Sequence, residues 1–212
     1  MKLTKGELMS IVLTLVAIGV GIYFYPMLPE RVASHWGVNG EVNGYMPRFW
    51  GAFLLPVVFA FLSALFIVIP RIDPKKENIK KFRGYFDAFI VAIFLFLSYI
   101  YMLSLTWNTG SRFNMTQYMA PALGALFICA GVLISKAEPN WTIGIRTPWT
   151  LSSETVWKKT HALSGTLFKI SGIIAVLGAV FPEYAFILII IPIIISAVTG
   201  LIYSYFAYKA EQ

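Results

Sequence analysis

The sequence predicts an all-α integral membrane protein, a bundle of six transmembrane helices with both termini in the cytoplasm. Two observations lead to this fold class. Hydrophobic residues make up 58% of the 212 residues and charged residues only 13%, whereas about a quarter of the residues in a soluble domain are charged. The apolar residues also fall into six runs of 18 to 20 residues each. At about 1.5 Å per residue, such a run spans the hydrocarbon layer of a bilayer as a helix.

We expect one integral membrane domain over residues 1–212, with spans at about 8–25, 51–69, 88–107, 117–135, 163–181 and 184–203. The first run follows Lys2 and Lys5 as in a secretory signal. It ends in the bulky residues 23–25 without a small-residue cleavage site, so we interpret it as an uncleaved span. Runs this long and apolar satisfy their backbone polar groups as helices. Strands of a membrane barrel would alternate polar and apolar residues, and these runs do not.

The orientation follows from the basic residues, because cytoplasmic loops retain lysine and arginine. With the N-terminus inside, fourteen of the seventeen basic residues are cytoplasmic. The three outside are Arg31, Arg48 and Arg112. Residues 26–50 then form an extracytoplasmic loop, and residues 70–87 and 136–162 form cytoplasmic loops. Basic residues dispersed over short loops do not line one soluble face, which argues against direct nucleic-acid binding.

The extracytoplasmic loop is rich in turn-forming residues between aromatic residues, so we expect it to be ordered. His35 and Trp36 lie in it with two glutamates nearby. A catalytic zinc site usually has three protein ligands, and the only other histidine, His161, is predicted on the opposite side of the membrane. We therefore predict no metal site. A histidine packed on an interfacial ring is favoured, with pH sensing as the alternative.

The second long cytoplasmic loop carries signals for a helix that enters the fifth span. Ser152 is the predicted N-cap, with Glu154 in the first turn near the positive end of the helix dipole, and the helix continues through Trp157. Arg146 lies between an apolar stretch and the turn at Pro148. This arginine is suited to bind a carboxylate, a lipid phosphate or a partner backbone. The alternative is an ordinary cytoplasmic anchor.

Lys169 is the one charged residue well inside a predicted span. A charge at the bilayer centre costs about 2.5 to 3.5 kcal/mol on insertion scales, and most of this cost is removed if the lysine reaches the headgroups. Asp87 directly precedes the third span on the same side of the membrane. The two residues are therefore a candidate intramembrane charge pair.

Several motifs of membrane enzymes are missing from the sequence. There is no HExxH zinc motif, no GxxxxGK[ST] phosphate loop, and no acidic residue deep in a span. We therefore expect neither an enzyme nor a cofactor. The residues leave open a small-solute permease or a lipid-handling protein, whose path would use polar residues of the third span such as Ser98, Tyr99 and Ser104.

Two segments carry a resemblance to a known family. The segment IGIRTPWTLSSETVW (143–157) resembles the signature of the SdpI family of bacterial membrane proteins. The segment LPERVASHWGVNGEVNGY (28–45) is similar to the extracytoplasmic segment that accompanies that signature. The resemblance covers the whole chain. It implies a multi-pass protein of the bacterial cytoplasmic membrane that protects against a secreted antimicrobial peptide toxin and signals by sequestering an autorepressor at the membrane.

The resemblance and the two loops together give the candidate binding residues, although no chemical role comes with them. In the cytoplasmic loop the candidates are Arg146, Thr147, Pro148, Trp149, Glu154 and Trp157. In the extracytoplasmic loop they are Pro29, Glu30, His35, Trp36, Gly40 and Gly44. The expected partners are membrane lipids, a peptide toxin and a cytoplasmic repressor protein.

Overall fold

Six long apolar helices dominate the structure, a computed structural model that describes residues 2–38 and 40–212. They are α1 (Lys5–Phe24), α2 (Arg48–Ile72), α4 (Arg83–Asn108), α5 (Met115–Lys136), α7 (Glu154–Val176) and α8 (Ala185–Lys209). Each of the six is long and apolar enough to cross a membrane. The prediction of six candidate membrane-spanning helices is confirmed.

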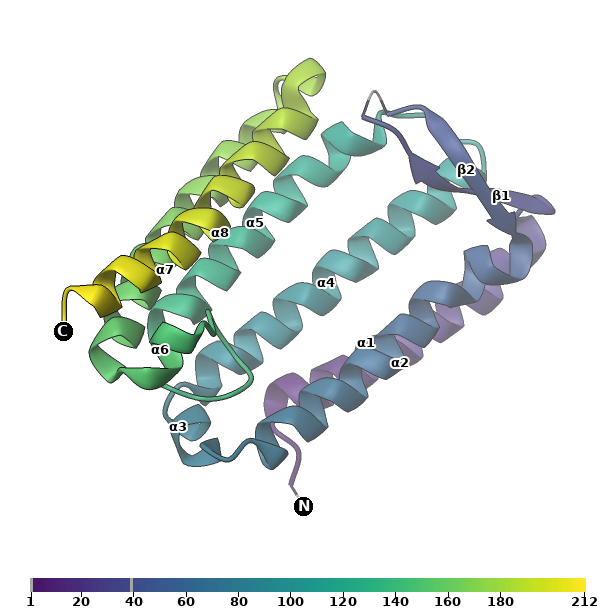
Figure 1. The fold of residues 1–212 in the computed structure, drawn as a ribbon. Helices are drawn as coiled ribbons and strands as arrows, with labels where there is room; N and C mark the ends of the chain where they lie inside the picture. The colour runs from purple at the N-terminus through teal and green to yellow at the C-terminus, as the bar shows by residue number, and fades with distance from the viewer. Residues whose placement is uncertain (1, 39) are drawn as a thin grey trace.

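The helices form two groups of three. Helices α1, α2 and α4 pack against one another, and α5, α7 and α8 form the second group. The groups meet where α4 packs against α5. Figure 1 shows the six helices running side by side between the two ends of the bundle.

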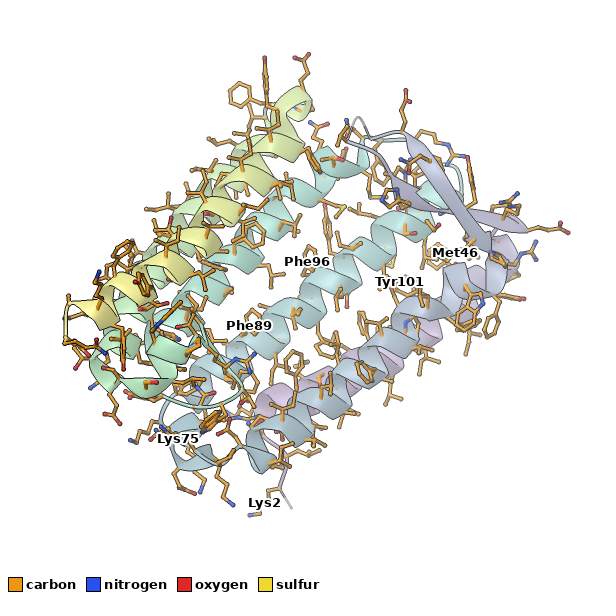
Figure 2. All side chains as sticks on the ribbon, in the orientation of Figure 1. Lys2, Met46, Lys75, Phe89, Phe96 and Tyr101 are labelled. Carbon is orange, nitrogen blue, oxygen red and sulfur yellow. The ribbon has the colours of Figure 1, made fainter. Side chains whose placement is uncertain are left out.

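Both termini lie at the same end of the bundle, together with the short helices α3 (Lys76–Lys81) and α6 (Pro148–Ser152) (Figure 1). We call this the α6 end. The opposite end carries the antiparallel strands β1 (Arg31–Trp36) and β2 (Val42–Pro47), and we call it the hairpin end. In Figure 2, Lys2 and Lys75 lie at the α6 end and Met46 lies at the hairpin end.

Short 3-10 turns complete the connections. The turn Tyr25–Met27 follows α1, the turn Leu177–Ala179 extends α7, and the turn Pro182–Tyr184 leads into α8. Pro26 lies within the first turn and Pro182 begins the last, and because proline has no N–H, neither position leaves a backbone donor unpaired.

Aromatic side chains fill the core of the first group. Phe59 of α2 and Phe94 of α4 are both fully buried, and their ring centroids lie 5.2 Å apart at 74°. Tyr101 of α4, labelled in Figure 2, is buried and donates its hydroxyl hydrogen to the carbonyl of Ala52 at 2.5 Å. Edge-to-face rings and a satisfied hydroxyl are typical of well-packed aromatic cores.

The second group is held together by close backbone approach. A Cβ atom added to Gly124 of α5 would lie 2.5 Å from the carbonyl oxygen of Gly172 of α7, and one added to Gly131 would lie 2.6 Å from that of Gly165. Small residues that let helix backbones approach this closely are the usual basis of helix association in membranes. The α5–α7 pair is therefore the tightest interface in this group.

The helix expected to enter the fifth span is present, but its N-cap differs from the prediction. α7 begins at Glu154, and the hydroxyl of Ser153, not that of Ser152, accepts the N–H of Val156 at 3.2 Å. Ser152 belongs to α6, where its hydroxyl donates to the Pro148 carbonyl at 2.6 Å. Ser152 and Ser153 both carry a hydroxyl that could cap the helix. Because Ser152 is the last residue of α6, Ser153 is the residue that caps α7.

Candidate functional site

The hairpin at one end of the bundle is fixed to α4. Asn108, the last residue of α4, accepts the N–H of Ala33 at 2.7 Å and donates to the carbonyl of Ala33 at 3.0 Å. Val32 is 1% exposed and lies against Gly51 of α2, where a Cβ atom would overlap it. These contacts hold β1 against both α2 and α4.

A cavity of about 910 Å³ lies between the tip of this hairpin and helices α4, α5 and α8. The hairpin contributes its residues 34–38 and 41–43, including His35, Trp36 and Glu41. The helices contribute a mainly apolar floor: Ile100, Met115, Met119, Leu123, Phe186, Ile189 and Ile190. Binding sites for small or extended ligands are commonly concave and apolar with a few polar groups. This hairpin cavity is the largest candidate site we describe.

Aromatic contacts fix one wall of the hairpin cavity. The rings of Trp36 and Trp107 meet edge to face with centroids 5.6 Å apart. The guanidinium of Arg112 lies 3.8 Å from the centroid of the Trp107 ring, and Arg112 also donates to the Trp107 carbonyl. A cation over an indole face is attracted by the ring quadrupole. Arg112, Trp107 and Trp36 thus form a continuous series of contacts beside the cavity.

The predicted extracytoplasmic residues divide into two sets. His35 and Trp36 line the hairpin cavity, and Nδ1 of His35 donates to Oδ1 of Asn43 across the strands. The other four do not line it: Pro29, Glu30, Gly40 and Gly44.

These four residues shape the hairpin instead. Pro29 and Glu30 accept hydrogen bonds from Arg48 through their carbonyls. Gly44 pairs opposite His35 in the sheet. Gly40 has φ +78° and lies against Asn114, so the turn there requires the conformational freedom of glycine.

At the α6 end, the loop of residues 137–147 between α5 and α6 is anchored to the other helix group. The carboxylate of Asp73, directly after α2, is 2% exposed and accepts the N–H of Trp141 at 3.0 Å and the hydroxyl of Thr142 at 2.7 Å. Asn78 of α3 donates to the carbonyl of Pro139 at 2.8 Å. The first helix group thus holds a loop that belongs to the second.

Asn140 organises the same loop from within. Its side chain is buried, and its Oδ1 accepts the N–H groups of Thr142 at 2.9 Å and Ile143 at 2.6 Å. Its Nδ2 donates to the carbonyl of Ile143 at 2.9 Å. One amide side chain satisfies several backbone groups of an irregular segment, as buried backbone requires.

Trp157 and His161 form the packed base of the 137–147 loop. Trp157 is fully buried, donates Nε1–H to the Ala137 carbonyl at 2.7 Å, and stacks on His161 with centroids 3.9 Å apart. Nε2 of His161 accepts the N–H of Ile145 at 3.0 Å, so Nδ1 carries the hydrogen that bonds the Trp157 carbonyl. Gly144 has φ +112° against this ring, which leaves no room for a side chain.

The remaining predicted cytoplasmic residues lie around α6. Thr147 caps α6 and donates to the hydroxyl of Ser204 at 3.0 Å, and Trp149 packs edge to face on Tyr205 of α8. Of the six predicted binding residues in this loop, three are exposed: Arg146, Pro148 and Glu154.

Among these exposed side chains, the Arg146 guanidinium donates back to the Trp141 carbonyl at 2.7 Å. Thr147, Trp149 and Trp157 therefore hold the loop in place. Arg146 and Glu154 remain exposed at the surface of the α6 end.

The candidate charge pair requires a correction. The carboxylate of Asp87 accepts Nε–H of Arg83 at 2.8 Å and the hydroxyl of Thr4 at 2.9 Å, and within the described residues it makes no ion pair with Lys169. Lys169 lies on α7 against Gly131 of α5, in the other helix group. The two residues share a side of the membrane in the sequence prediction but belong to different groups of the bundle.

A buried ionic cluster that the sequence did not reveal lies beside Asp87. Glu7 of α1 has a side chain with no exposed surface, and its two carboxylate oxygens accept Arg71 of α2 at 2.5 and 2.7 Å. Arg83 of α4 donates to the same carboxylate at 2.8 Å and to Thr4 at 2.9 Å. Thr4 and Glu7 also form the capping box of α1. A bidentate, charge-assisted pair of this kind is among the stronger polar contacts in proteins.

Among residues 2–38 and 40–212, no group of three His, Cys, Asp or Glu side chains is placed to hold a metal ion. His35 and His161 lie at opposite ends of the bundle, at the hairpin and beneath the 137–147 loop.

The sequence of the chain is similar to those of known proteins. Residues 136–204 match the model of the SdpI/YfhL protein family, and residues 12–60 match that of a domain of unknown function, DUF1648. The chain is 28% identical over 206 residues to the protein named Immunity protein SdpI of Bacillus subtilis (strain 168), covering 97% of each chain. No solved structure matches it. With six helices that are long and apolar enough to span a membrane, a match to the SdpI/YfhL family model over residues 136–204 and similarity along nearly the whole chain to an immunity protein, this chain is a multi-pass cell-membrane protein similar to the SdpI family.

Proposed function

We propose that this protein is an immunity protein that binds a secreted amphipathic killing peptide in the hairpin cavity. The observation that carries the proposal is the cavity itself, because an apolar floor within the bundle and a polar rim on the hairpin match the two faces of an amphipathic peptide. The similarity over nearly the whole chain to a protein named as an immunity protein supports it.

The proposal includes an orientation. The hairpin end faces outward and the α6 end faces the cytoplasm, as the excess of lysine and arginine at the α6 end favours. A peptide that arrives from outside then meets the hairpin cavity first. The residues 26–50 are the extracytoplasmic loop, residues 70–87 and 136–162 are cytoplasmic, and the chain forms one membrane domain.

A second part of the proposal concerns signalling. The 137–147 loop presents Arg146 to the cytoplasm, where an autorepressor binds when the hairpin cavity is occupied. The loop is bonded to both helix groups, through Asp73 in the first and Trp157 in the second. A change in the relative position of the two groups would therefore alter the loop. A ligand that favours one arrangement shifts the equilibrium toward it.

The cavities give little support to a small-solute permease. A hydrophilic path would need a continuous polar lining, but the floor of the hairpin cavity is mainly apolar. A second cavity of about 350 Å³ lies under the 137–147 loop and is lined by Phe66, Phe86, Phe89 and Phe168 among other apolar residues. Phe89, one of these lining residues, lies on α4 (Figure 2). Of the possible ligands, these linings favour apolar ones.

The test of immunity uses a sensitive host challenged with a secreted amphipathic killing peptide, the class of toxin that the family resemblance implies. Cells that express this protein are expected to survive peptide concentrations that kill the empty-vector strain. Leu123→Trp, which places an indole in the hairpin cavity, is expected to abolish survival. Leu95→Trp is the matched control. Leu95 of α4 is 54% exposed and does not line the cavity, so cells with this variant are expected to be fully protected.

The possible outcomes separate the two parts of this claim. Unchanged killing of cells with the wild-type chain, present in the membrane at normal abundance, would disprove immunity. Full protection by Leu123→Trp would leave immunity standing and remove the hairpin cavity as its site. For signalling, Arg146→Glu is expected to keep protection and to lose the peptide-dependent response of a reporter placed behind the gene's own promoter.

A further inference from the structure

The charged residues around the hairpin cavity are unevenly distributed. Among the described residues that line it, Glu41 is the one charged carboxylate and no lysine or arginine is present. The three arginines of this end lie over aromatic rings: Arg31 over Tyr45 at 5.8 Å, Arg48 over Tyr25 at 5.9 Å and Arg112 over Trp107 at 3.8 Å. The arginines are thus engaged elsewhere, and the rim of the cavity carries a negative charge.

The lining of the cavity is polar at the hairpin and apolar within the helices. His35, Glu41 and Asn43 line it on the hairpin, whereas Leu123 of α5 and Ile190 of α8 line it within the helices. Leu123 lies eight positions beyond Met115, the first residue of α5, so the floor is about 12 Å deeper along the helix at 1.5 Å per residue. A ligand that fills the cavity therefore has one end at the hairpin and an apolar portion in the bundle.

The exposed carboxylate of Glu41 has no cationic partner among the described residues, and only its backbone carbonyl is bonded, to the N–H of Gly37 at 2.8 Å. A carboxylate beside an apolar cavity attracts positive groups and repels negative ones, and such charges set specificity more than total affinity. An anionic lipid headgroup or a free peptide carboxylate would meet Glu41 without a compensating cation.

We propose that Glu41 selects the ligand of the hairpin cavity by charge: the ligand is a peptide whose apolar segment enters the bundle and whose adjoining lysine, arginine or terminal ammonium pairs with Glu41. This inference rests on the proposed function, because it names the class of peptide that the same cavity accepts. Glu41 is a specificity-determining residue, and the apolar floor supplies most of the affinity.

The test uses the full-length chain in nanodiscs of phosphatidylcholine, whose zwitterionic headgroups do not select by charge. The probes are two fluorescent synthetic peptides with the same leucine and alanine segment and blocked termini, one ending in lysine and the other in glutamate. Fluorescence anisotropy gives each affinity after subtraction of the signal from empty nanodiscs. The lysine peptide is expected to bind the wild-type chain about fivefold more tightly, the upper range for an exposed ion pair.

Matched variants assign the preference to one carboxylate. Glu41→Gln is expected to bring the ratio of affinities to about one, and Glu41→Lys to reverse it. Glu30→Gln removes an exposed carboxylate at the base of the same hairpin that does not line the cavity, and it is expected to leave the ratio unchanged. A fivefold preference that persists in Glu41→Gln would overturn the inference.

Leu123→Trp distinguishes this inference from the proposed function. If both peptides bind the wild-type chain equally and Leu123→Trp abolishes binding, the hairpin cavity remains the site and the role of Glu41 is disproved. If neither peptide binds, or if Leu123→Trp leaves both affinities and their ratio intact, the cavity does not bind peptides of this class. That result would contradict both claims.

Discussion

At the α6 end of the bundle, the side chains of Glu7, Asp73 and Asn140 are buried, and each accepts two or more hydrogen bonds. At the hairpin end, His35 and Glu41 are exposed around an open cavity. Buried polar groups are costly when a partner is lost, whereas exposed ones exchange their partners with water. We therefore expect substitutions at the α6 end to destabilise the fold, and substitutions at the hairpin end to change binding with little effect on stability.

The largest expected loss of stability follows removal of the Glu7 carboxylate. Glu7→Ala leaves Arg71 and Arg83 without their shared acceptor, and we expect the free energy of unfolding to fall by about 3 kcal/mol. This value is at the lower end of the range for a broken buried ion pair, because both arginines are partly exposed. The measurement is thermal unfolding of the purified chain in detergent. An unchanged unfolding temperature would mean that the ionic cluster does not hold α1, α2 and α4 together.

The matched control for this variant is Glu77→Ala. Glu77 pairs with Lys80 at 2.7 Å on the exposed face of α3. Its hydrogen bond with Lys80 lowers the pKa of Glu77, so any contribution of the pair to stability is present above the ordinary pKa of glutamate and is lost as the pH falls through the lowered value. Exposed pairs contribute little, and the unfolding temperature is expected to stay unchanged.

A smaller effect is expected at Asp73. Asp73→Ala removes the acceptor of the Trp141 N–H and of the Thr142 hydroxyl, and we expect a loss of about 2 kcal/mol. Hydrogen exchange of residues 137–147 should accelerate more than exchange in the α5–α7 interface, because the loop loses its attachment to the first helix group. Lys75→Ala is the control, since only the backbone N–H of Lys75 bonds Asp73. Equal exchange in both variants would show that the loop does not depend on Asp73.

The smallest effect on stability is expected at the hairpin. His35→Ala removes an exposed side chain that hydrogen-bonds Asn43, and the free energy of unfolding should change by about 0.5 kcal/mol or less. The same variant should weaken peptide binding, because His35 lines the hairpin cavity. A strong loss of stability here would contradict the contrast between the two ends.

Much of the fold was predictable because length and hydropathy determine whether a helix crosses a membrane. The contacts between helices were not, since they join residues far apart in sequence. Glu7 bonds residues 64 and 76 positions away. In the sequence, Arg71 and Arg83 look like ordinary cytoplasmic anchors.

The candidate site was predictable in part for the same reason. The family signature drew attention to Thr147 and Trp157, which the structure shows as buried anchors of the loop. It gave no indication of Asp73, whose partners lie across the other helix group. Turn-forming residues indicated order in residues 26–50, but the pairing of β1 with β2, with its irregular register at His35, required the structure.

The position of Glu7 also has a consequence for biogenesis. The ribosome delivers α1 to the membrane before Arg71 and Arg83 have been made, so the carboxylate of the first helix has no counter-charge when that helix inserts. A charged group near hydrocarbon is costly until it is paired. The carboxylate therefore gains its first counter-charge when α2 brings Arg71 and its second when α4 brings Arg83, and a nascent chain truncated between α1 and α2 should associate with the membrane less stably than one truncated after α4.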